Sequence, residues 1–490
     1  MLALYQRKRN MKMNTRALWS STVAALNLLF GTALAAEPPA AEPSPLMQWL
    51  TQDYMLGNWG GFRTELSQHG VDFEFLYAGS LPVNLDGGLE NGSAYQGGLL
   101  MLLDVNSEKL LDYPGGTFHV GSLWLHGEKP FSDRYIGDLN KVNLLDLQNG
   151  AWLWEIYYEQ KLWENKLSVK AGQLAIDRDF VAAEYYNSLA GITLLNQTFF
   201  YPTMAFNVWD IPFFPVGHHG LASTPYGTPG VRVRYDPCEH AYVQAGVYDG
   251  NPDTDSPGTH FDMGGNQGAL IYFETGWKLN QEKDATGLPG NLKLGGYYHT
   301  DEFYDMYEGS FAAFDNYLAA LGLPGLGVYP NPATHDGNYG VYFLADTMLW
   351  RETGKEDPAQ QGLTGFFRVG YAPEDRNLAT WGLDGGLVYK GLVPKRDWDT
   401  LALGLSYLKL SDDLADAQQD INAILGGFAL PPAFPKTADY EAVIELSYKA
   451  QITAWWTVQT SIERVFHPGG RAFFDIPDSW AFSVQTMIRF

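Results

Sequence analysis

The sequence predicts an all-β protein, a transmembrane antiparallel β-barrel of about 16 strands with a short N-terminal helix and an inward-folded constriction loop. Three observations lead to this prediction: segments in which apolar and polar residues alternate with period two, links of alternating length, and one long link rich in aromatic residues. The chain has 53 Gly, 29 Tyr, 27 Phe and 15 Trp but only 18% charged residues. This composition suits a β-protein with an apolar and a wet face better than a helical enzyme.

Residues 1–35 have the pattern of a secretory signal peptide. Five basic residues precede an apolar stretch, and Ala33-Leu34-Ala35 is a small-residue cleavage site. An N-terminal membrane anchor is the alternative, but the small residues and the Pro-rich sequence that follows disfavour it. The formal net charge is −24, and loss of this segment removes five basic residues and no acid. So acidic a chain is not expected to bind nucleic acid.

Residues 36–70 are predicted to form a periplasmic tether followed by a short helix. The first ten of them are rich in Pro, Ala and Glu. Trp59, Phe62 and Leu66 have the spacing of one helical face, and Gly70 is well placed to end the helix. The helix would lead directly into the first strand.

The barrel is predicted to occupy residues 71–490. Sixteen segments alternate with period two between turn signals, and bacterial outer-membrane barrels have an even number of strands. Their centres lie near residues 75, 101, 120, 156, 169, 232, 245, 273, 295, 344, 367, 385, 404, 445, 458 and 485.

The last segment, Trp480–Phe490, shows the alternation most clearly. Large or neutral residues at even positions alternate with smaller or polar residues at odd positions. Aromatic residues stand at both ends, as in the girdles of a membrane barrel. A strand of about 9–11 residues can cross a bilayer at a tilt. A strand of a soluble β-sandwich can look the same, so the links provide an independent check.

The links alternate in length as an outer-membrane barrel requires if both termini are periplasmic. Short turns are expected after even-numbered strands and longer surface loops after odd-numbered ones; residues 372–379 are a short exception. The short turns include 163–165, 236–239 and 451–453. The long links are 128–150, 175–228, 250–267, 301–337 and 411–437. A soluble sandwich gives no reason for this asymmetry.

Charged residues of both signs fall on the inward positions. Trp152 and Trp154 are expected to face lipid and Glu155 and Glu159 the lumen, because a charge facing lipid costs about 2–4 kcal/mol near the midplane. Most inward charges are expected to pair across neighbouring strands. They are Asp72, Glu74, Glu155, Glu159, Lys170, Arg232, Arg234, Lys293, Arg368, Glu441, Glu445, Lys449, Glu463 and Arg489.

The link Ala175–Thr228 is the longest, and a connection of this length is normally functional. Its many aromatic residues predict that it folds into the lumen and narrows the pore; an external cap packed on its own aromatics is the alternative. A lining of mixed charge suits neutral polyhydroxylated solutes better than the single-sign rings of ion-selective pores. The candidates for solute contact are Arg232, Arg234, Arg178, Glu155, Glu159, Lys170, Tyr185, Tyr186, Phe199 and Trp209.

Searches for catalytic, cofactor and metal motifs identify none. Asp249–Asp255 resembles the start of a calcium-binding EF-hand loop, but Thr254 and His260 stand where that loop needs Gly and Glu, so a turn is favoured and calcium stays open. The pair His218-His219 lacks a zinc-binding frame. The single cysteine, Cys238, cannot form an internal disulfide.

Several segments resemble the carbohydrate-selective outer-membrane porins of the OprB type. Trp59-Gly60-Gly61-Phe62-Arg63, with Leu66 and Gly70, resembles that family's N-terminal motif, and Gly230–Tyr235 with Gln244–Pro252 resembles its central strand pair. The resemblance covers nearly all of the chain after residue 35. It implies a sixteen-stranded barrel that admits glucose and other monosaccharides by facilitated diffusion. It also implies arginine, glutamate and aromatic residues at a constriction formed by inward loops.

The resemblance also implies partners and a location. The partners would be small neutral sugars, the lipid bilayer and the outer-membrane assembly machinery, which would recognise the C-terminal Phe490. The location would be the outer membrane of a Gram-negative bacterium. Trimers are usual for sixteen-stranded porins, so a homotrimer is an open alternative.

The sequence therefore predicts a passive channel with no catalytic residue and no cofactor. A general or ion-selective porin is the main alternative. An outer-membrane enzyme would need a nucleophile and base at the rim, which the sequence does not identify. A soluble secreted β-rich lectin is the third alternative.

Overall fold

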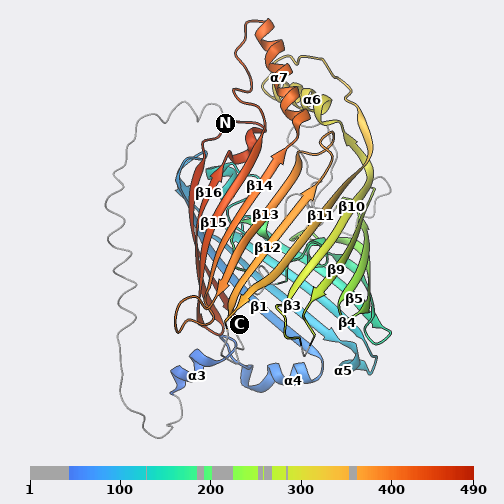
Figure 1. Ribbon diagram of the computed structural model, residues 1–490, viewed down its shortest axis with the longest axis vertical. Helices are drawn as coiled ribbons and strands as arrows, with labels where there is room; N and C mark the ends of the chain where they lie inside the picture. The colour runs from blue at the N-terminus through green and yellow to red at the C-terminus, as the bar shows by residue number, and fades with distance from the viewer. Residues whose placement is uncertain are drawn as a thin grey trace, which may run out of the picture. The chain divides into compact units, whose positions relative to one another are not determined.

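The chain folds into a closed antiparallel β-barrel (Figure 1). The computed structural model describes residues 44–128, 130–184, 192–200, 224–251, 258, 268–282, 285–352 and 361–490. The strands are β1 (Val71–Asp86), β2 (Gly92–Ser93), β3 (Gln96–Asn106), β4 (Gly116–Gly127), β5 (Gly150–Leu162), β6 (Leu167–Leu174), β7 (Thr228–Cys238), β8 (Ala241–Asp249), β9 (Ala269–Leu279), β10 (Gly290–Tyr304), β11 (Thr334–Arg351), β12 (Gly362–Tyr371), β13 (Ala379–Lys390), β14 (Thr400–Leu410), β15 (Tyr440–Thr453), β16 (Trp456–Phe466) and β17 (Ser479–Arg489).

Sixteen long strands form the wall, as the sequence predicts. Each predicted strand centre falls within one of them, and the remaining strand, β2, has two residues and pairs with the end of β1. Each long strand pairs with the next one along the chain, and β1 also pairs with β17, from Leu76↔Arg489 to Asp86↔Trp480. This last pairing closes the barrel.

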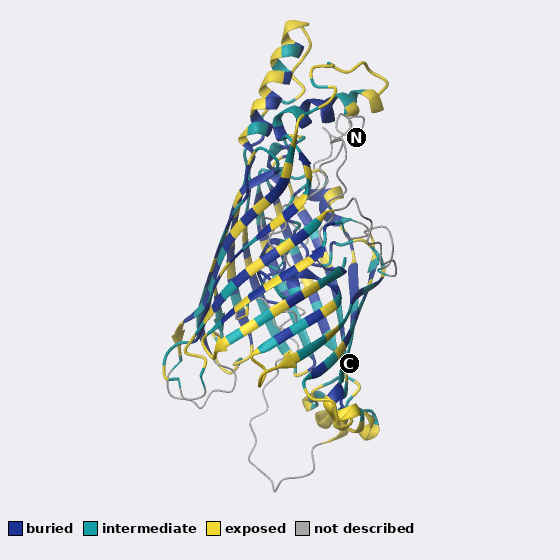
Figure 2. Ribbon diagram, turned by 90° about the vertical axis from the view of Figure 1, so that its right-hand side faces the viewer, coloured by how far each residue is buried: buried dark blue, intermediate teal, exposed yellow. Residues whose placement is uncertain are grey.

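Alternating burial separates the two faces of the wall (Figure 2). In β17, Ala481, Ser483 and Gln485 are buried, whereas Trp480 and Val484 are exposed on the outside. The strands β7, β14 and β15 follow the predicted alternation in the same way. The period-two pattern of the sequence thus places apolar residues outside and polar residues inside.

In β5 the predicted orientation of two tryptophans is wrong. Trp152 and Trp154 are both buried on the inner side of the wall, not exposed to lipid. Glu155 pairs with Gly121 of β4, whereas Leu153 pairs with the residue after Gly121, so Trp154 has no partner across the ladder. This extra residue forms a β-bulge that shifts the alternation by one position. Both tryptophans and Glu155 therefore face the lumen.

The links differ in length at the two ends of the barrel, as predicted. The turns 163–166, 239–240 and 454–455 lie at the end of the barrel where the chain reaches residue 490, and the strand ends that the long links join lie at the opposite end (Figure 1). The short link 372–378 is the predicted exception.

Two of the long links contain helices that the sequence analysis did not identify, α6 (Met306–Ala320) and α7 (Asp412–Gly427). Side chains just before them cap their N-termini: Asp305 accepts a hydrogen bond from the N–H of Glu308 (2.9 Å), and the hydroxyl of Ser411 accepts one from Leu414 (3.3 Å). The two helices pack against each other through Phe311, Phe314, Ile421 and Leu425.

The predicted N-terminal helix is confirmed. The turn η2 (Trp59–Gly61) leads into α4 (Phe62–Gln68), and Gly70 has a φ of +83°, a left-handed value common where helices end. The other short helices are α3 (Pro45–Thr51), α5 (Ser107–Leu111), η3 (Ser132–Ile136), η4 (Ile176–Arg178), η5 (Gln197–Phe199) and η7 (Pro468–Arg471). Among the described residues, no helix has the length and apolar character needed to cross a membrane. The predicted signal peptide and part of the predicted tether fall in residues 1–43, outside the described part.

One residue of α4 ties the two strands that close the barrel. Arg63 donates hydrogen bonds to the backbone oxygens of Phe73 in β1 (3.0 Å) and of Phe490 (2.5 Å). Its guanidinium carbon lies 3.8 Å from the ring centroid of Tyr54 and 4.6 Å from that of Trp59. A residue that belongs to neither strand therefore joins β1 to the end of the chain.

Candidate functional site

The long link after β6 enters the barrel. Its first described arm, residues 175–184, packs Ile176, Phe180 and Val181 against tyrosines on the inner face of β8 to β11. The backbone N–H of Val181 donates to Glu274 of β9 (3.0 Å), and that of Glu184 donates to Asp346 of β11 (2.8 Å). The wall therefore fixes this arm through its main chain.

The second described arm of the same link, residues 192–200, is held in the same way. The backbone N–H groups of Leu195 and Asn196 donate to the two carboxylate oxygens of Glu445 in β15 (2.7 and 3.0 Å). The side-chain amide of Asn196 donates to Glu463 of β16 (3.0 Å). Both carboxylates are fully buried beneath the arm.

The second arm also reaches β12 and β13. The hydroxyl of Thr198 donates to Asp384 (3.2 Å), and Arg368 donates to the backbone oxygen of Thr198. The ring of Phe199 packs edge-on against Phe366, with centroids 6.0 Å apart. Contacts with inward positions of so many strands confirm that the two described arms of the link fold into the lumen. The alternative of an external cap is wrong for the described arms.

A second link also folds inward, and here the expectation of a surface loop is wrong. Residues 130–149, between β4 and β5, bury Phe131 and Ile136 against Val465 and Ala481 on the inner face of β16 and β17. The apolar residues of this link gave no distinct signal in the sequence, because an external loop can also pack on its own apolar residues.

A wall carboxylate holds this second link as well. Glu441 of β15 accepts hydrogen bonds from the backbone N–H groups of Leu139 and Asn140, both at 2.8 Å, and from Gly469 at 2.7 Å. Glu441 and Glu445 thus place one buried carboxylate of the same strand under each inward link.

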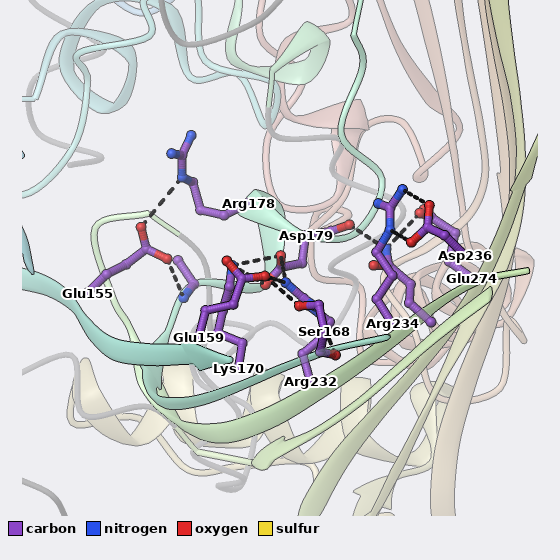
Figure 3. A network of polar contacts seen from close by, with 12 residues as sticks. Glu155, Glu159, Ser168, Lys170, Arg178, Asp179, Arg232, Arg234, Asp236 and Glu274 are labelled. Atoms are coloured by element: carbon purple, nitrogen blue, oxygen red, sulfur yellow. Dashed lines mark hydrogen bonds and ion pairs between the residues drawn. The ribbon is translucent and has the colours of Figure 1, made fainter. Parts of the chain in front are cut away.

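Charged residues of β5, β6 and β7 form a network with the first arm (Figure 3). Lys170 Nζ lies 2.8 Å from Asp179 Oδ1. Arg232 Nη2 lies 3.1 Å from Glu159 and 3.4 Å from Asp179, and its Nη1 donates to the hydroxyl of Ser168 (2.6 Å). Although burial alone would raise the pKa of Asp179, the two neighbouring cations hold that pKa below its usual value. The carboxylate of Asp179 is thus a buried anion between two cations, and its ion pairs fix the arm in place.

Arg178 is the most accessible member of the network. Its side chain is 30% exposed, against 5% for Arg232. Its Nε lies 3.5 Å from Glu155, and its guanidinium carbon lies 5.3 Å from the ring centroid of Trp154. His119 approaches the same carboxylate, with Nε2 3.8 Å from Glu155. Buried groups therefore orient a cation that remains open to the lumen.

Arg234 belongs to a separate cluster. It donates two hydrogen bonds to Asp236 (2.8 and 3.0 Å), and its guanidinium carbon lies 3.8 Å from the ring centroid of Tyr242. Lys278 Nζ lies 3.6 Å from the same aspartate. The structure does not place Arg234 in contact with Arg232, although both lie on the inner face of β7.

The structure brings some of the predicted site residues together and separates others. One network contains Glu155, Glu159, Lys170, Arg178 and Arg232. Phe199 lies on the second arm, buried against Phe366. Tyr185, Tyr186 and Trp209 lie outside the described residues.

The sequence analysis missed His119, Glu274 and Asp346. The period-two pattern places each of them on an inner face, and this is the only signal in the sequence. Their partners come from segments far away in the chain, 93 residues for Glu274 and 162 for Asp346. Local patterns cannot indicate such pairings.

Within the described part of the chain, no group of His, Cys, Asp or Glu is arranged to hold a metal ion. In the segment that resembles a calcium loop, Asp249 accepts a hydrogen bond from the backbone N–H of Asn251 (3.0 Å), as in a tight turn. Residues 252–257 of that segment are outside the described part.

Comparison with known families decides the class of this barrel. The model of the carbohydrate-selective porin family, OprB, matches residues 90–490. The chain belongs to this family. It is an outer-membrane sugar porin, as the sequence predicted, and membership of a porin family implies a channel.

Relatives of this porin match along most of its length. Porin B of Pseudomonas aeruginosa is 28% identical over 467 residues, which cover 92% of this chain and 93% of that protein. The putative porin QuiX of Acinetobacter baylyi is 22% identical over 470 residues, which cover 90% and 93%.

Solved structures share the fold of this porin. The high-pH structure of Pseudomonas putida OprB matches with a TM-score of 0.72 at 23% identity, covering 90% of this chain and 99% of that one. Its low-pH structure matches with a TM-score of 0.52 at 18% identity over the same shares. These likenesses show a common sixteen-stranded barrel.

Proposed function

We propose that this porin carries glucose and other monosaccharides by facilitated diffusion through an aqueous pore that the link between β6 and β7 constricts. The observation on which the proposal rests is Arg178, a partly exposed cation on an arm that the inner wall holds in place. Membership of the carbohydrate-selective family supports sugars as the class of solute.

The exposed guanidinium suits a neutral sugar. Its planar N–H groups donate hydrogen bonds, and a sugar hydroxyl both accepts and donates them. Each such bond replaces one with water, so its net contribution is only about 0.5–1.5 kcal/mol. A weak site of this kind holds a solute briefly and releases it, as conduction requires. The solute moves down its own gradient, without a covalent step.

The buried cations have a different role in this proposal. Lys170 and Arg232 have 8% and 5% of their side chains exposed and are both paired with Asp179. They support the arm that presents Arg178, and they influence the solute only through its position. We therefore assign solute contact to Arg178 and support to Arg232, among the residues that the sequence proposed.

Planar-bilayer recordings with a panel of sugars test this proposal. Glucose and other monosaccharides should reduce the ion current in a concentration-dependent way. Arg178→Ala should weaken this block about fivefold, because one hydrogen bond of about 1 kcal/mol is lost. Arg234→Ala is the matched control, since Asp236 already holds its guanidinium in another cluster. Strong selectivity among small ions without any sugar block would support a general or ion-selective porin instead.

We also propose that residues 1–35 direct export, that residues 36–70 form a periplasmic tether and helix, and that residues 71–490 form the pore domain.

Phe490 is proposed as the feature that the assembly machinery recognises, and a homotrimer as the assembled state. The mass of the purified protein tests the cleavage, and chemical crosslinking in membranes tests the trimer. The amount that reaches the outer membrane without Phe490 tests the assembly role.

A further inference from the structure

Glu445 uses its whole carboxylate to hold the second arm of the constricting link. Its two oxygens accept the backbone N–H groups of Leu195 and Asn196, and the side chain is fully buried. In the described part of the chain it forms no ion pair with a lysine or arginine. A buried carboxylate without a cation requires hydrogen-bond donors, and here the link supplies them.

Glu441 has the same arrangement under the other inward link. It is fully buried and accepts the backbone N–H groups of Leu139 and Asn140, as well as that of Gly469 before β17. Two segments of the chain that lie far apart in sequence are therefore attached to the same strand by the same kind of contact.

The spacing of the two glutamates relates the two links to each other. Glu441 and Glu445 are four residues apart on β15, so both face the lumen and lie roughly 13 Å apart along the strand. Since β15 is paired on both sides, to β14 and β16, this separation is rigid. The two links are thereby held at a fixed distance from each other.

We propose that Glu441 and Glu445 are positioning residues of the pore, which set the width of the constriction by fixing both inward links on β15. They do not contact the solute, because the links cover them. The part of this proposal that concerns sugar binding rests on the proposed function; the part that concerns pore width does not.

A carboxylate is required at these positions because both of its oxygens accept hydrogen bonds. A glutamine of the same shape keeps one acceptor but turns an NH₂ group towards the other backbone N–H. Two donors then face each other, and a buried N–H loses its partner. Glu445→Gln should therefore release the arm 192–200 while leaving the volume of the wall unchanged.

Single-channel recording of Glu445→Gln tests the proposal. We expect a larger conductance than in the wild type, because the arm 192–200 loses about 1 kcal/mol of anchoring to the wall. The glucose block should weaken as well, because this arm belongs to the same link as Arg178 and helps to fix its path. Glu441→Gln should raise the conductance through the other link. If each glutamate holds its own link, the effects of the two substitutions on the conductance should combine independently in the double variant.

The matched control is Asp72→Asn. Asp72 is an exposed residue of β1 at an inward position, and it holds no link in the described part of the chain. The substitution makes the same exchange of a carboxyl group for an amide, so a change in conductance that reflects this exchange in the lumen alone would appear equally in Asp72→Asn. That result would overturn the proposal. Unchanged conductance and unchanged glucose block in a correctly folded Glu445→Gln would overturn it as well.

A variant on the link keeps the proposal testable if the wall variants fail to fold. Asn196→Ala leaves the wall side chains and the backbone contacts of Glu445 in place. It removes the hydrogen bond that the Asn196 side chain donates to Glu463 and the one that it accepts from the backbone N–H of Thr198. It should shift conductance and glucose block in the same direction by a smaller amount, and no shift would count against the proposal. If the wild type shows no sugar block, the proposed function fails, whereas the conductance comparison still decides whether Glu441 and Glu445 set the pore width.

Discussion

At the scale of single residues, two arginines of one network are expected to contribute differently to stability, because one is buried and the other is partly exposed. Arg232 is nearly inaccessible and lies between Glu159 and Asp179, whereas Arg178 faces the lumen beside Glu155. Removal of a partner from a buried pair leaves a buried charge without compensation, which is strongly destabilising. Glu155 is buried too, but the partly exposed side chain of Arg178 would leave a space that water can enter, and His119 Nε2 would remain 3.8 Å from the carboxylate of Glu155.

Arg232→Ala is therefore expected to destabilise the protein by about 3–5 kcal/mol, because Lys170 alone would remain beside the carboxylates of Asp179 and Glu159, whose side chains are 9% and 19% exposed. Thermal unfolding in detergent, followed by circular dichroism, measures the change. Arg178→Ala should lower the transition temperature much less. Equal decreases of the transition temperature in Arg232→Ala and Arg178→Ala would show that burial does not determine how much each arginine contributes to stability.

Asp138, in the inward link before β5, predicts a pH dependence. Burial raises its pKa to about 7, from an ordinary value of 3.8. The folded protein thus holds the proton more tightly than the unfolded chain, so stability should fall as pH rises from about 4 to 7. Asp138→Asn should melt above the wild type at pH 8, and the difference should shrink towards pH 4.

The control for this pH dependence is Asp133→Asn in the same link. The side chain of Asp133 is 59% exposed, so its carboxylate keeps its contact with water. The same pH dependence of melting in Asp138→Asn as in the wild type would show that another group is responsible.

At the scale of elements, the seam of the barrel depends on a helix outside it. Arg63 of α4 joins the backbone of β1 to that of Phe490, and Tyr54 and Trp59 pack on its guanidinium. The last strand pair to form in a closed barrel is the one with the fewest local contacts. A residue that bridges it should stabilise the closed state in particular.

Arg63→Ala is expected to destabilise the barrel by about 2–3 kcal/mol, through two lost hydrogen bonds and two lost cation–π contacts. The measurement is the temperature at which the folded band disappears in unheated gel electrophoresis. Phe62→Ala, at an exposed position of the same helix, is the control and should have little effect. A similar shift in both variants would mean that helix α4 as a whole matters, not the bridge.

The elements also show how far the sequence could predict the structure. Strands were predictable because alternation is local, and every predicted centre falls within a strand. The bulge at Trp154 was not predictable, because the side chains of Trp152 and Trp154 suit either an apolar core or a lipid-facing surface. The helices α6 and α7 were not predicted, because the links that contain them were interpreted as surface loops from their length alone. Asp305 and Ser411 nevertheless stand at helix-capping positions.

At the scale of the whole molecule, the wall and the constriction come from different parts of the chain. The strands form a cylinder of fixed size, and the two inward links reduce the space within it. The sequence predicted the first inward link from its aromatic residues, and it placed Glu155, Glu159, Lys170 and Arg232 on the inner face. It could not predict which carboxylates hold the links, because those contacts join segments hundreds of residues apart, 250 for Glu445 and Leu195.

The contacts between wall carboxylates and links have a consequence for how the solute preference of this channel can change. Glu274, Asp346, Glu441 and Glu445 all hold the backbone of a link. Nearly any amino acid supplies the same N–H group, so mutations can change the link's side chains and leave its path intact. New solute preferences can then arise by drift or by engineering within the two links, on a barrel that stays the same.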